Sequence, residues 1–135
     1  MSLETLYQKG NDECATPAWI LNDLFRGWYD PCPLSQGLVQ RDGLHSDWLG
    51  DRIFLNPPYS NPMPWVEKAI AESKKGKVVA LLLKHDSSTR WWAKLHEANA
   101  HFLPVMGRLA FSGKIAPFPS VIVILSTEQT RSQNK

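Results

Sequence analysis

The chain has few cysteines, little net charge and no long apolar run, and each shortage argues against a class of protein. Cys14 and Cys32 are the only cysteines and show neither a CxxC pair nor a zinc-type spacing, which leaves free thiols as the expectation. The formal net charge is +2 over 135 residues, so any basic surface for nucleic acid must be local. No apolar run reaches the length of a membrane span, and residues 1–5 lack a signal-peptide pattern. We therefore expect no membrane association and a location in a reducing cytoplasm.

Apolar periodicity and turn residues predict alternating helices and strands. The expected helices cover residues 16–26, 64–74 and 88–98. The expected strands cover residues 28–29, 52–55, 77–83, 101–105 and 121–125, with one arm of a hairpin at 107–113. This order predicts an α/β fold whose sheet is mostly parallel and ends in an antiparallel hairpin. We expect a single domain over residues 1–135, with a loose arm at 1–13 and a polar tail at 126–135.

Polar residues follow several expected strands directly, namely Asp30, Asn56 and Lys84. In α/β sheets, ligands bind beyond the carboxyl ends of the strands. We therefore expect these side chains to meet at one crevice.

The most specific motif is Asn56-Pro57-Pro58-Tyr59, which follows the apolar strand at residues 53–55. Two prolines fix two φ angles and remove two backbone donors, so the strand must end in a stiff turn. The Asn56 side-chain oxygen and the Pro57 carbonyl can accept both hydrogens of an exocyclic amino group, while the Tyr59 ring stacks on the base. A Pro-rich turn with Tyr59 as a packing aromatic is the plainer interpretation.

This run is shared by the amino-methyltransferases, which transfer a methyl group from S-adenosylmethionine to an amino or amide nitrogen. From about Asp12 to about Leu125 the chain resembles the phage-type, Dam-like DNA N6-adenine methyltransferases. The matching segments are residues 16–17, 30–31, 42–44, 47–48, 56–60, 64–66, 89–91, 107–109, 111 and 116–120. The resemblance implies a compact Rossmann-like methyltransferase fold, S-adenosylmethionine as the donor and a flipped adenine in DNA as the acceptor. It also implies that Asn56, Pro57, Pro58 and Tyr59 are catalytic.

Candidates for the donor site come from the first part of the chain. Thr16-Pro17 could begin a helix whose free N–H groups bind the donor carboxylate, and a plain helix cap is a compatible interpretation. Asp30-Pro31 would face the donor ammonium group, or Asp30 could only cap a turn. Asp42 could accept the ribose hydroxyls, with a solvated loop acid and Asp47 as competing interpretations. Larger methyltransferases carry a Gly-rich loop after the first acidic strand, and residues 30–34 contain no glycine.

Lys84, Arg90, Arg108 and Lys114 are candidates for phosphate contacts, although any one of them alone reads as an ordinary surface charge. The target base must leave the duplex, and stacking on Tyr59 can return about 1–3 kcal/mol of that cost. A homodimer could be needed to hold a duplex. We expect a prokaryotic host cell, with a phage or prophage origin plausible.

Other functions remain open at this stage. The same chemistry could act on cytosine N4 or on a glutamine side chain of a protein. The absence of a Gly-rich loop would also suit a decayed methyltransferase fold that serves as a binding subunit, whereas the intact Asn56–Tyr59 run opposes that function.

Overall fold

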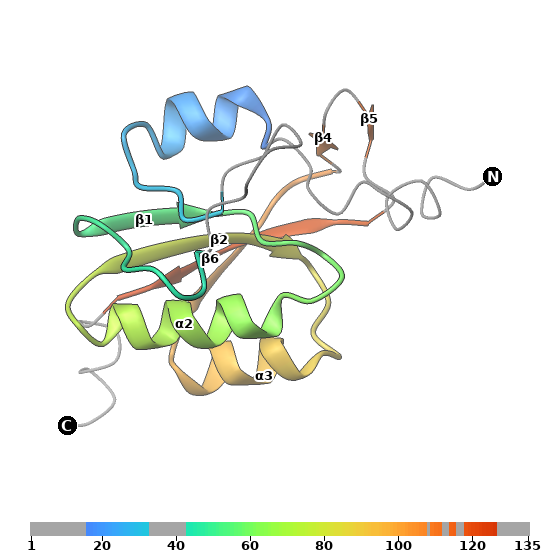
Figure 1. Cartoon of the computed structure of the whole chain (residues 1–135). Helices are drawn as coiled ribbons and strands as arrows, with labels where there is room; N and C mark the ends of the chain where they lie inside the picture. The colour runs from blue at the N-terminus through green and yellow to red at the C-terminus, as the bar shows by residue number, and fades with distance from the viewer. Residues whose placement is uncertain (1–15, 33–42, 108, 112–113, 116–117, 127–135) are drawn as a thin grey trace.

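The computed structural model describes residues 16–32, 43–107, 109–111, 114–115 and 118–126 (Figure 1). The expected loose arm at 1–13 lies outside the described residues, as does the expected tail apart from Ser126. The helices and strands are η1 (Ile20–Leu24), β1 (Arg52–Leu55), α2 (Met63–Ser73), β2 (Val78–Lys84), α3 (Arg90–Glu97), β3 (His101–Pro104), β4 (Ala110–Phe111), β5 (Lys114–Ile115) and β6 (Ser120–Leu125).

The main sheet has the strand order β1-β2-β6-β3 (Figure 1). β1 pairs with β2 in parallel, with Leu55 beside Leu81, and Tyr29 adds one parallel bridge to Ile53. β6 is antiparallel to both of its neighbours, β2 and β3. The expectation of a mostly parallel sheet is therefore wrong, because this sheet is mixed, with one parallel and two antiparallel ladders.

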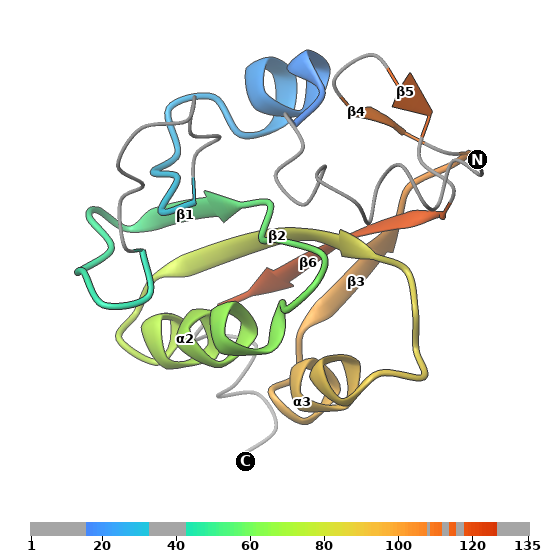
Figure 2. The ribbon, with the colours of Figure 1, turned by 45° about the vertical axis from the view of Figure 1, so that its right-hand side comes forward.

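The connection between β3 and β6 explains the antiparallel ladders. Two strands can pair in parallel only if the chain between them crosses back to the opposite end of the strands. Here β6 instead begins at the end of the sheet where β3 finishes, and the Val105 N–H donates to the Ser120 carbonyl at 3.0 Å. Within this connection, β4 and β5 pair antiparallel as a separate two-stranded sheet, which Figure 2 shows beside the main sheet. The expected arm at 107–113 is therefore represented only by β4, which pairs with β5 outside the main sheet.

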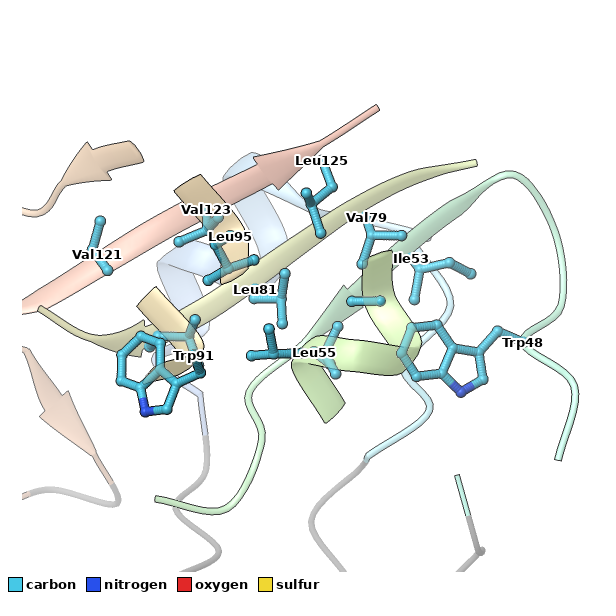
Figure 3. Packing of buried hydrophobic residues seen from close by; sticks show 13 residues of the cluster. Trp48, Ile53, Leu55, Val79, Leu81, Trp91, Leu95, Val121, Val123 and Leu125 are labelled. Atoms are coloured by element: carbon cyan, nitrogen blue, oxygen red, sulfur yellow. The ribbon is translucent and has the colours of Figure 1, made fainter. Parts of the chain in front are cut away.

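Helices cover both faces of the main sheet. α2 and α3 lie on one face, and the helical segment around η1 (blue in Figures 1 and 2) lies over the other. Successive strand residues point to opposite faces, so Val79, Leu81 and Leu83 pack with α2 and α3, while Ala80 and Leu82 pack with η1. Figure 3 shows the α2–α3 side of this core. The interior of β2 is buried on both faces, as its continuous apolar run predicts.

The first helix differs from the expected one. Ala18 and Trp19 are helical, and the chain then forms the π-helix η1, in which the Phe25 N–H donates to the Ile20 carbonyl at 3.0 Å. The N-cap of η1 is Trp19, which makes no side-chain cap hydrogen bond. The Thr16 hydroxyl accepts from Asn56 Nδ2 at 3.3 Å, and the expected N-cap role of Thr16 is not observed.

α2 and α3 begin much as their sequences predict. A proline stands in the first turn of α2, where its missing N–H has no helical partner to lose. Thr89 is the N-cap of α3, and its hydroxyl oxygen accepts from the Trp92 N–H at 3.3 Å. Of the adjacent tryptophans, Trp91 is buried, whereas Trp92 is half-buried and stacks on both His85 and Phe102.

Candidate active site

The carboxyl ends of adjacent parallel segments lie at one edge of the main sheet. Asp30 follows the Tyr29 bridge, Asn56 follows β1 and Lys84 ends β2, and the parallel pairings place these ends side by side. The chain from β3 to β6 returns to this edge, where Ser120 lies opposite Lys84. The structure therefore places the three strand-end residues at the same end of the sheet, and their meeting in one crevice stays a prediction.

The Asn56-Pro57-Pro58-Tyr59 run links β1 to the turn before α2. Pro57 is buried, and the other three residues are half-buried. The Tyr59 ring meets the Phe118 ring edge-on, with centroids 5.0 Å apart and ring planes at 73°. The Asn56 amide oxygen and the Tyr59 hydroxyl are both buried from solvent.

Thr16 and Asn56 are far apart in the sequence and in contact in the structure. Asn56 Nδ2 donates to Thr16 Oγ1 at 3.3 Å, across a separation of 40 residues. Ile20 and Phe25 pack in the same cluster as Phe54 of β1, and the Phe25 and Phe54 rings stack with centroids 4.5 Å apart. The segment that begins at Thr16 is thereby joined to the end of β1.

Asp30 lies in a tight turn that contains no glycine. Its Oδ1 atom accepts from the Cys32 N–H at 2.8 Å, which closes a local Asx-type turn. Pro31 is buried, whereas Asp30 and Cys32 are half-buried. The turn-capping interpretation of Asp30 is thus observed, directly after the bridge between Tyr29 and Ile53.

The loop that begins at Gly43 packs against this turn. Gly43 lies against the Pro31 carbonyl and the Trp65 ring, in a space too small for a side chain. Trp48 is buried, and its Nε1–H donates to the Gly43 carbonyl at 2.7 Å. Asp42, the candidate for the ribose contact, lies outside the described residues, and its chain neighbour Gly43 is held at Pro31.

Lysine side chains hold the loop at residues 43–48 from two directions. Lys68 of α2 donates to the carbonyls of Leu44, at 3.1 Å, and of Ser46, and its Nζ atom lies 5.4 Å from the centroid of the Trp48 ring. Lys77 donates to the Trp48 carbonyl. The loop is therefore anchored to α2 and to the start of β2.

Glu72 is a buried carboxylate near the end of α2. It forms ion pairs with Lys75 at 2.6 Å and with Lys77 at 2.7 Å. Burial by itself raises the pKa of Glu72, but the hydrogen bonds and charges of Lys75 and Lys77 outweigh it, so the pKa lies below its ordinary value. Lys77 thus connects Glu72 of α2 to the Trp48 carbonyl of the loop.

A small pocket lies beside Tyr59. Its volume is about 140 Å³, and it is lined by Tyr59, Pro62, Leu83, Lys84, Asp86, Thr89 and Trp91. An engineered cavity of roughly 150 Å³ admits benzene, so this pocket has the size of a single aromatic ring. Lys84 is half-buried, and its Nζ atom lies 5.7 Å from the centroid of the Phe118 ring. Its charge is therefore directed toward the rings at the sheet edge.

Asp86 in this pocket is held by its own loop. Its Oδ1 atom accepts from the Ser88 N–H at 3.0 Å and from the Ser88 hydroxyl at 2.5 Å. Its backbone carbonyl accepts from the Thr89 hydroxyl at 3.0 Å. The hydrogen bonds from Ser88 hold the pKa of Asp86 below its ordinary value, so the carboxylate is charged at neutral pH.

The phosphate candidates are only partly described. Arg90 is exposed at the first position of α3, which follows the carboxyl end of β2 and so lies near the same edge. Arg108 lies outside the described residues, and Lys114 is described only through the backbone of β5. The structure therefore brings Lys84 and Arg90 to the edge that carries Asn56.

The described part of the chain offers neither a metal-binding cluster nor a membrane-spanning helix. There, no cluster of three or more His, Cys, Asp or Glu side chains could hold a metal ion. The helices in these same ranges are all too short or too polar to cross a membrane.

Sequence reasoning missed the residues that support the motif. Phe118 belongs to the matching segment at 116–120, yet its contact with Tyr59 joins residues that are far apart in the sequence. Gly43 could have been found as the glycine directly after the candidate Asp42. The sequence offers no signal for Lys68, within α2, or for Lys77, before β2, because lysines are mostly solvated.

Comparison with known proteins identifies relatives in phages. The chain is 44% identical over 105 residues to the "DNA N-6-adenine-methyltransferase" of Haemophilus phage HP1, an alignment that covers 68% of this chain and 61% of the relative. It is 34% identical over 58 residues to the "DNA N-6-adenine-methyltransferase" of Escherichia phage T1, covering 42% of this chain and 24% of that relative. The chain thus spans about three fifths of the length of the first relative and about a quarter of the second. No solved structure matches the chain.

The family assignment rests on a match to most of the chain. A model of the DNA N-6-adenine-methyltransferase (Dam) family matches residues 37–135. The matched range includes the Asn56–Tyr59 run and the loop at 43–48, whereas Thr16 and Asp30 precede it. The resemblance expected from the sequence motifs is confirmed, and the chain belongs to the DNA N-6-adenine-methyltransferase (Dam) family.

Proposed function

We propose that the chain transfers a methyl group from S-adenosylmethionine to the N6 amino group of an adenine at specific sites in DNA. The observation that carries this proposal is the position of the Asn56–Tyr59 run, directly after a buried parallel strand and within the residues matched by the Dam family. The named relatives are N-6-adenine methyltransferases, and an enzyme of this kind requires a methyl donor.

The acceptor base is held by the motif that ends β1. The Asn56 side-chain oxygen and the Pro57 carbonyl each accept one hydrogen of the amino group, which favours a more pyramidal nitrogen. Tyr59 stacks on the base while Phe118 supports the edge of its ring, and Pro58 stiffens the turn. The nitrogen loses its proton late, so the residues mainly orient it, and holding it about 3–3.5 Å from the methyl carbon contributes several kcal/mol.

The proposed donor site consists of Thr16, Pro17, Asp30, Pro31 and Asp42. The described groups suit a cationic ligand with hydroxyls, since Asp30 offers a half-buried carboxylate in a turn that needs no glycine. Gly43 brings the loop backbone against Pro31, so the loop and the strand end form one continuous surface. When bound, S-adenosylmethionine supplies a methyl group on an already activated sulfonium.

DNA is the proposed partner, bound with the target adenine flipped out of the duplex. Lys84, Arg90, Arg108 and Lys114 are the proposed phosphate contacts, and the exposed position of Arg90 at the sheet edge supports its role. A homodimer could hold the duplex.

The finer fold that we propose is a compact Rossmann-like methyltransferase domain over residues 1–135. A mixed sheet with helices on both faces, and polar residues at the carboxyl edge of its parallel strands, support this assignment. We place the protein in the cytoplasm of a prokaryotic host cell. Both named relatives belong to phages, which supports a phage or prophage origin.

A labelled-methyl transfer assay on DNA, RNA and protein, with the product nucleoside identified, tests the proposal. We expect N6-methyladenine in DNA. Asn56→Ala should remove most of the transfer and spare donor binding measured by calorimetry, because the amide holds the acceptor. The matched control Asn61→Ala replaces an exposed asparagine in the same turn and should preserve both. N4-methylcytosine, a methylated protein, or donor binding without any transfer would each contradict the proposed function.

A further inference from the structure

We propose that the Thr16 side chain is a positioning residue that fixes the orientation of the Asn56 amide. The inference rests on the proposed function, because it explains how Asn56 presents an oxygen to the acceptor amino group. Its basis is the hydrogen bond from Asn56 Nδ2 to Thr16 Oγ1, at 3.3 Å and across 40 residues. This contact gives the Thr16 hydroxyl a role toward the target base, in addition to the proposed role of Thr16 in binding S-adenosylmethionine.

The chemical need for such a partner follows from the asymmetry of an amide. One end of the Asn56 side chain is an acceptor oxygen and the other is an NH₂ group with two donors. The amino group of the target base donates hydrogen bonds and therefore needs the amide oxygen. A flipped amide would place its own NH₂ group against that amino group, so two donors would face each other. A threonine hydroxyl can accept from Nδ2 or donate to Oδ1. In this structure it accepts from Nδ2, which leaves Oδ1 directed away from Thr16, and Oδ1 is the atom that the proposed chemistry uses.

Thr16 is held firmly enough to perform this role. The Pro17 carbonyl accepts from the Ile20 N–H at 3.0 Å and from the Leu21 N–H at 3.3 Å, which ties Thr16-Pro17 to the helical segment. Ile20 is fully buried in the cluster that contains Phe54 of β1. The position of the hydroxyl is thus set by the same core that sets the end of β1.

The Asn56 side of the contact is held as well. Leu55 is fully buried, Pro57 is buried, and the proline fixes the backbone directly after Asn56. With both backbones fixed, the side chain of Asn56 keeps rotational freedom, and the hydrogen bond to the Thr16 hydroxyl favours one orientation of its amide. The same contact joins the segment proposed to bind the donor to the motif proposed to bind the acceptor.

Thr16→Val tests the inference because valine has nearly the shape of threonine without its hydroxyl and keeps the peptide groups. In single-turnover methyl transfer to DNA, we expect a rate roughly tenfold lower, the factor that corresponds to about 1.4 kcal/mol. The dissociation constant for S-adenosylmethionine and the thermal unfolding temperature should stay near the parental values. Thr16→Ser, which restores a hydroxyl at the same position, should recover most of the rate.

A second background separates orientation from packing. Asn56→Asp has two oxygens at the end of the side chain, so its orientation no longer matters for accepting a hydrogen. Adding Thr16→Val to Asn56→Asp should therefore reduce the residual single-turnover rate by less than twofold, compared with about tenfold in the Asn56 background. A packing role for Thr16 would give the same loss in both backgrounds.

The results that overturn the inference differ from those that overturn the proposed function. An unchanged rate in Thr16→Val, an equal loss in both backgrounds, or a loss of donor affinity with no change in transfer would each refute the positioning role. Failure of the parental protein to methylate adenine would instead refute the proposed function, with Thr16 not yet in question.

Discussion

Gly43 lies so close to Pro31 that a Cβ atom built on the glycine would be 2.1 Å from the Pro31 carbonyl oxygen and 2.8 Å from the Trp65 ring. Real Cβ atoms do not approach other atoms this closely, and a backbone carbonyl cannot rotate aside as a side chain could. Asp30 precedes one partner of this contact and Asp42 precedes the other. A side chain at position 43 would therefore push apart the two segments that carry donor candidates.

Gly43→Ala should lower both stability and donor affinity. Overpacking at this contact is expected to cost about 1–3 kcal/mol of the free energy of unfolding in urea. The affinity for S-adenosylmethionine should fall as well, because the loop must move away from the Pro31 turn. Gly50→Ala is the matched control, since Gly50 has a positive φ of 81° but open space around it, and it should leave donor affinity unchanged. Parental donor affinity in Gly43→Ala would show that the loop takes no part in donor binding.

Tyr59 variants test the stacking role of its ring. Tyr59→Ala should lower single-turnover transfer by about 10- to 100-fold, because base stacking on an aromatic side chain contributes about 1–3 kcal/mol. Tyr59→Phe keeps the ring face and its edge contact with Phe118, so its rate should stay close to the parental one. A target base in a mismatch should suffer less from Tyr59→Ala, since less unpairing energy must be offset. An equal loss of rate in Tyr59→Phe and Tyr59→Ala would show that the hydroxyl matters and would contradict the stacking role.

Glu72 should make stability depend on pH in the acid range. Its pKa is lower in the folded protein than its ordinary value of 4.5, so its contribution is present above that pH and is lost as the pH falls through the folded pKa. Glu72→Gln should therefore cost about 1–2 kcal/mol of unfolding free energy at pH 7, and the difference should shrink below pH 4.5. Glu67→Gln is the control, because Glu67 is exposed and lies 3.9 Å from Lys94. A difference that is constant with pH would mean that the ion pairs are not its cause.

Arg90 should contribute to DNA binding through charge alone. Arg90→Ala is expected to reduce the slope of log K against log salt by about 0.9, with little change in donor affinity. Lys74→Ala removes an exposed charge at the end of α2, which precedes β2 and so lies at the opposite edge of the sheet. Titration of one duplex at several salt concentrations compares the two variants. An equal change of slope in Arg90→Ala and Lys74→Ala would show that DNA does not bind preferentially at the end of the sheet that carries Asn56.

Several parts of the site could be predicted from the sequence because they depend on local chemistry. The paired prolines end β1 at Asn56, and the apolar run of β2 is buried on both faces as predicted. Thr89 caps α3 within the helix expected at 88–98. The family also followed from the order of short motifs, and the match over residues 37–135 confirms it.

Other features were wrong or invisible at the level of sequence because they depend on distant partners. β6 begins at the end of the sheet where β3 finishes, since the Val105 N–H donates to the Ser120 carbonyl, and no local pattern reports where a connection ends. The Thr16 hydroxyl, which was expected to cap the first helix, instead accepts from Asn56 Nδ2 across 40 residues.

The sequence by itself determined the strands at β1, β2 and β6, the helices α2 and α3, the Asn56–Tyr59 turn and the family, since each is encoded in adjacent residues through φ restriction and apolar period. Only the tertiary structure decided which side chains support that turn. Thr16 reaches Asn56 and Phe118 reaches Tyr59 across long stretches of chain, and Gly43 fits against Pro31. These contacts form because helices and loops pack on the two faces of one sheet and so bring distant parts of the chain together. That packing depends on the whole chain and not on adjacent residues.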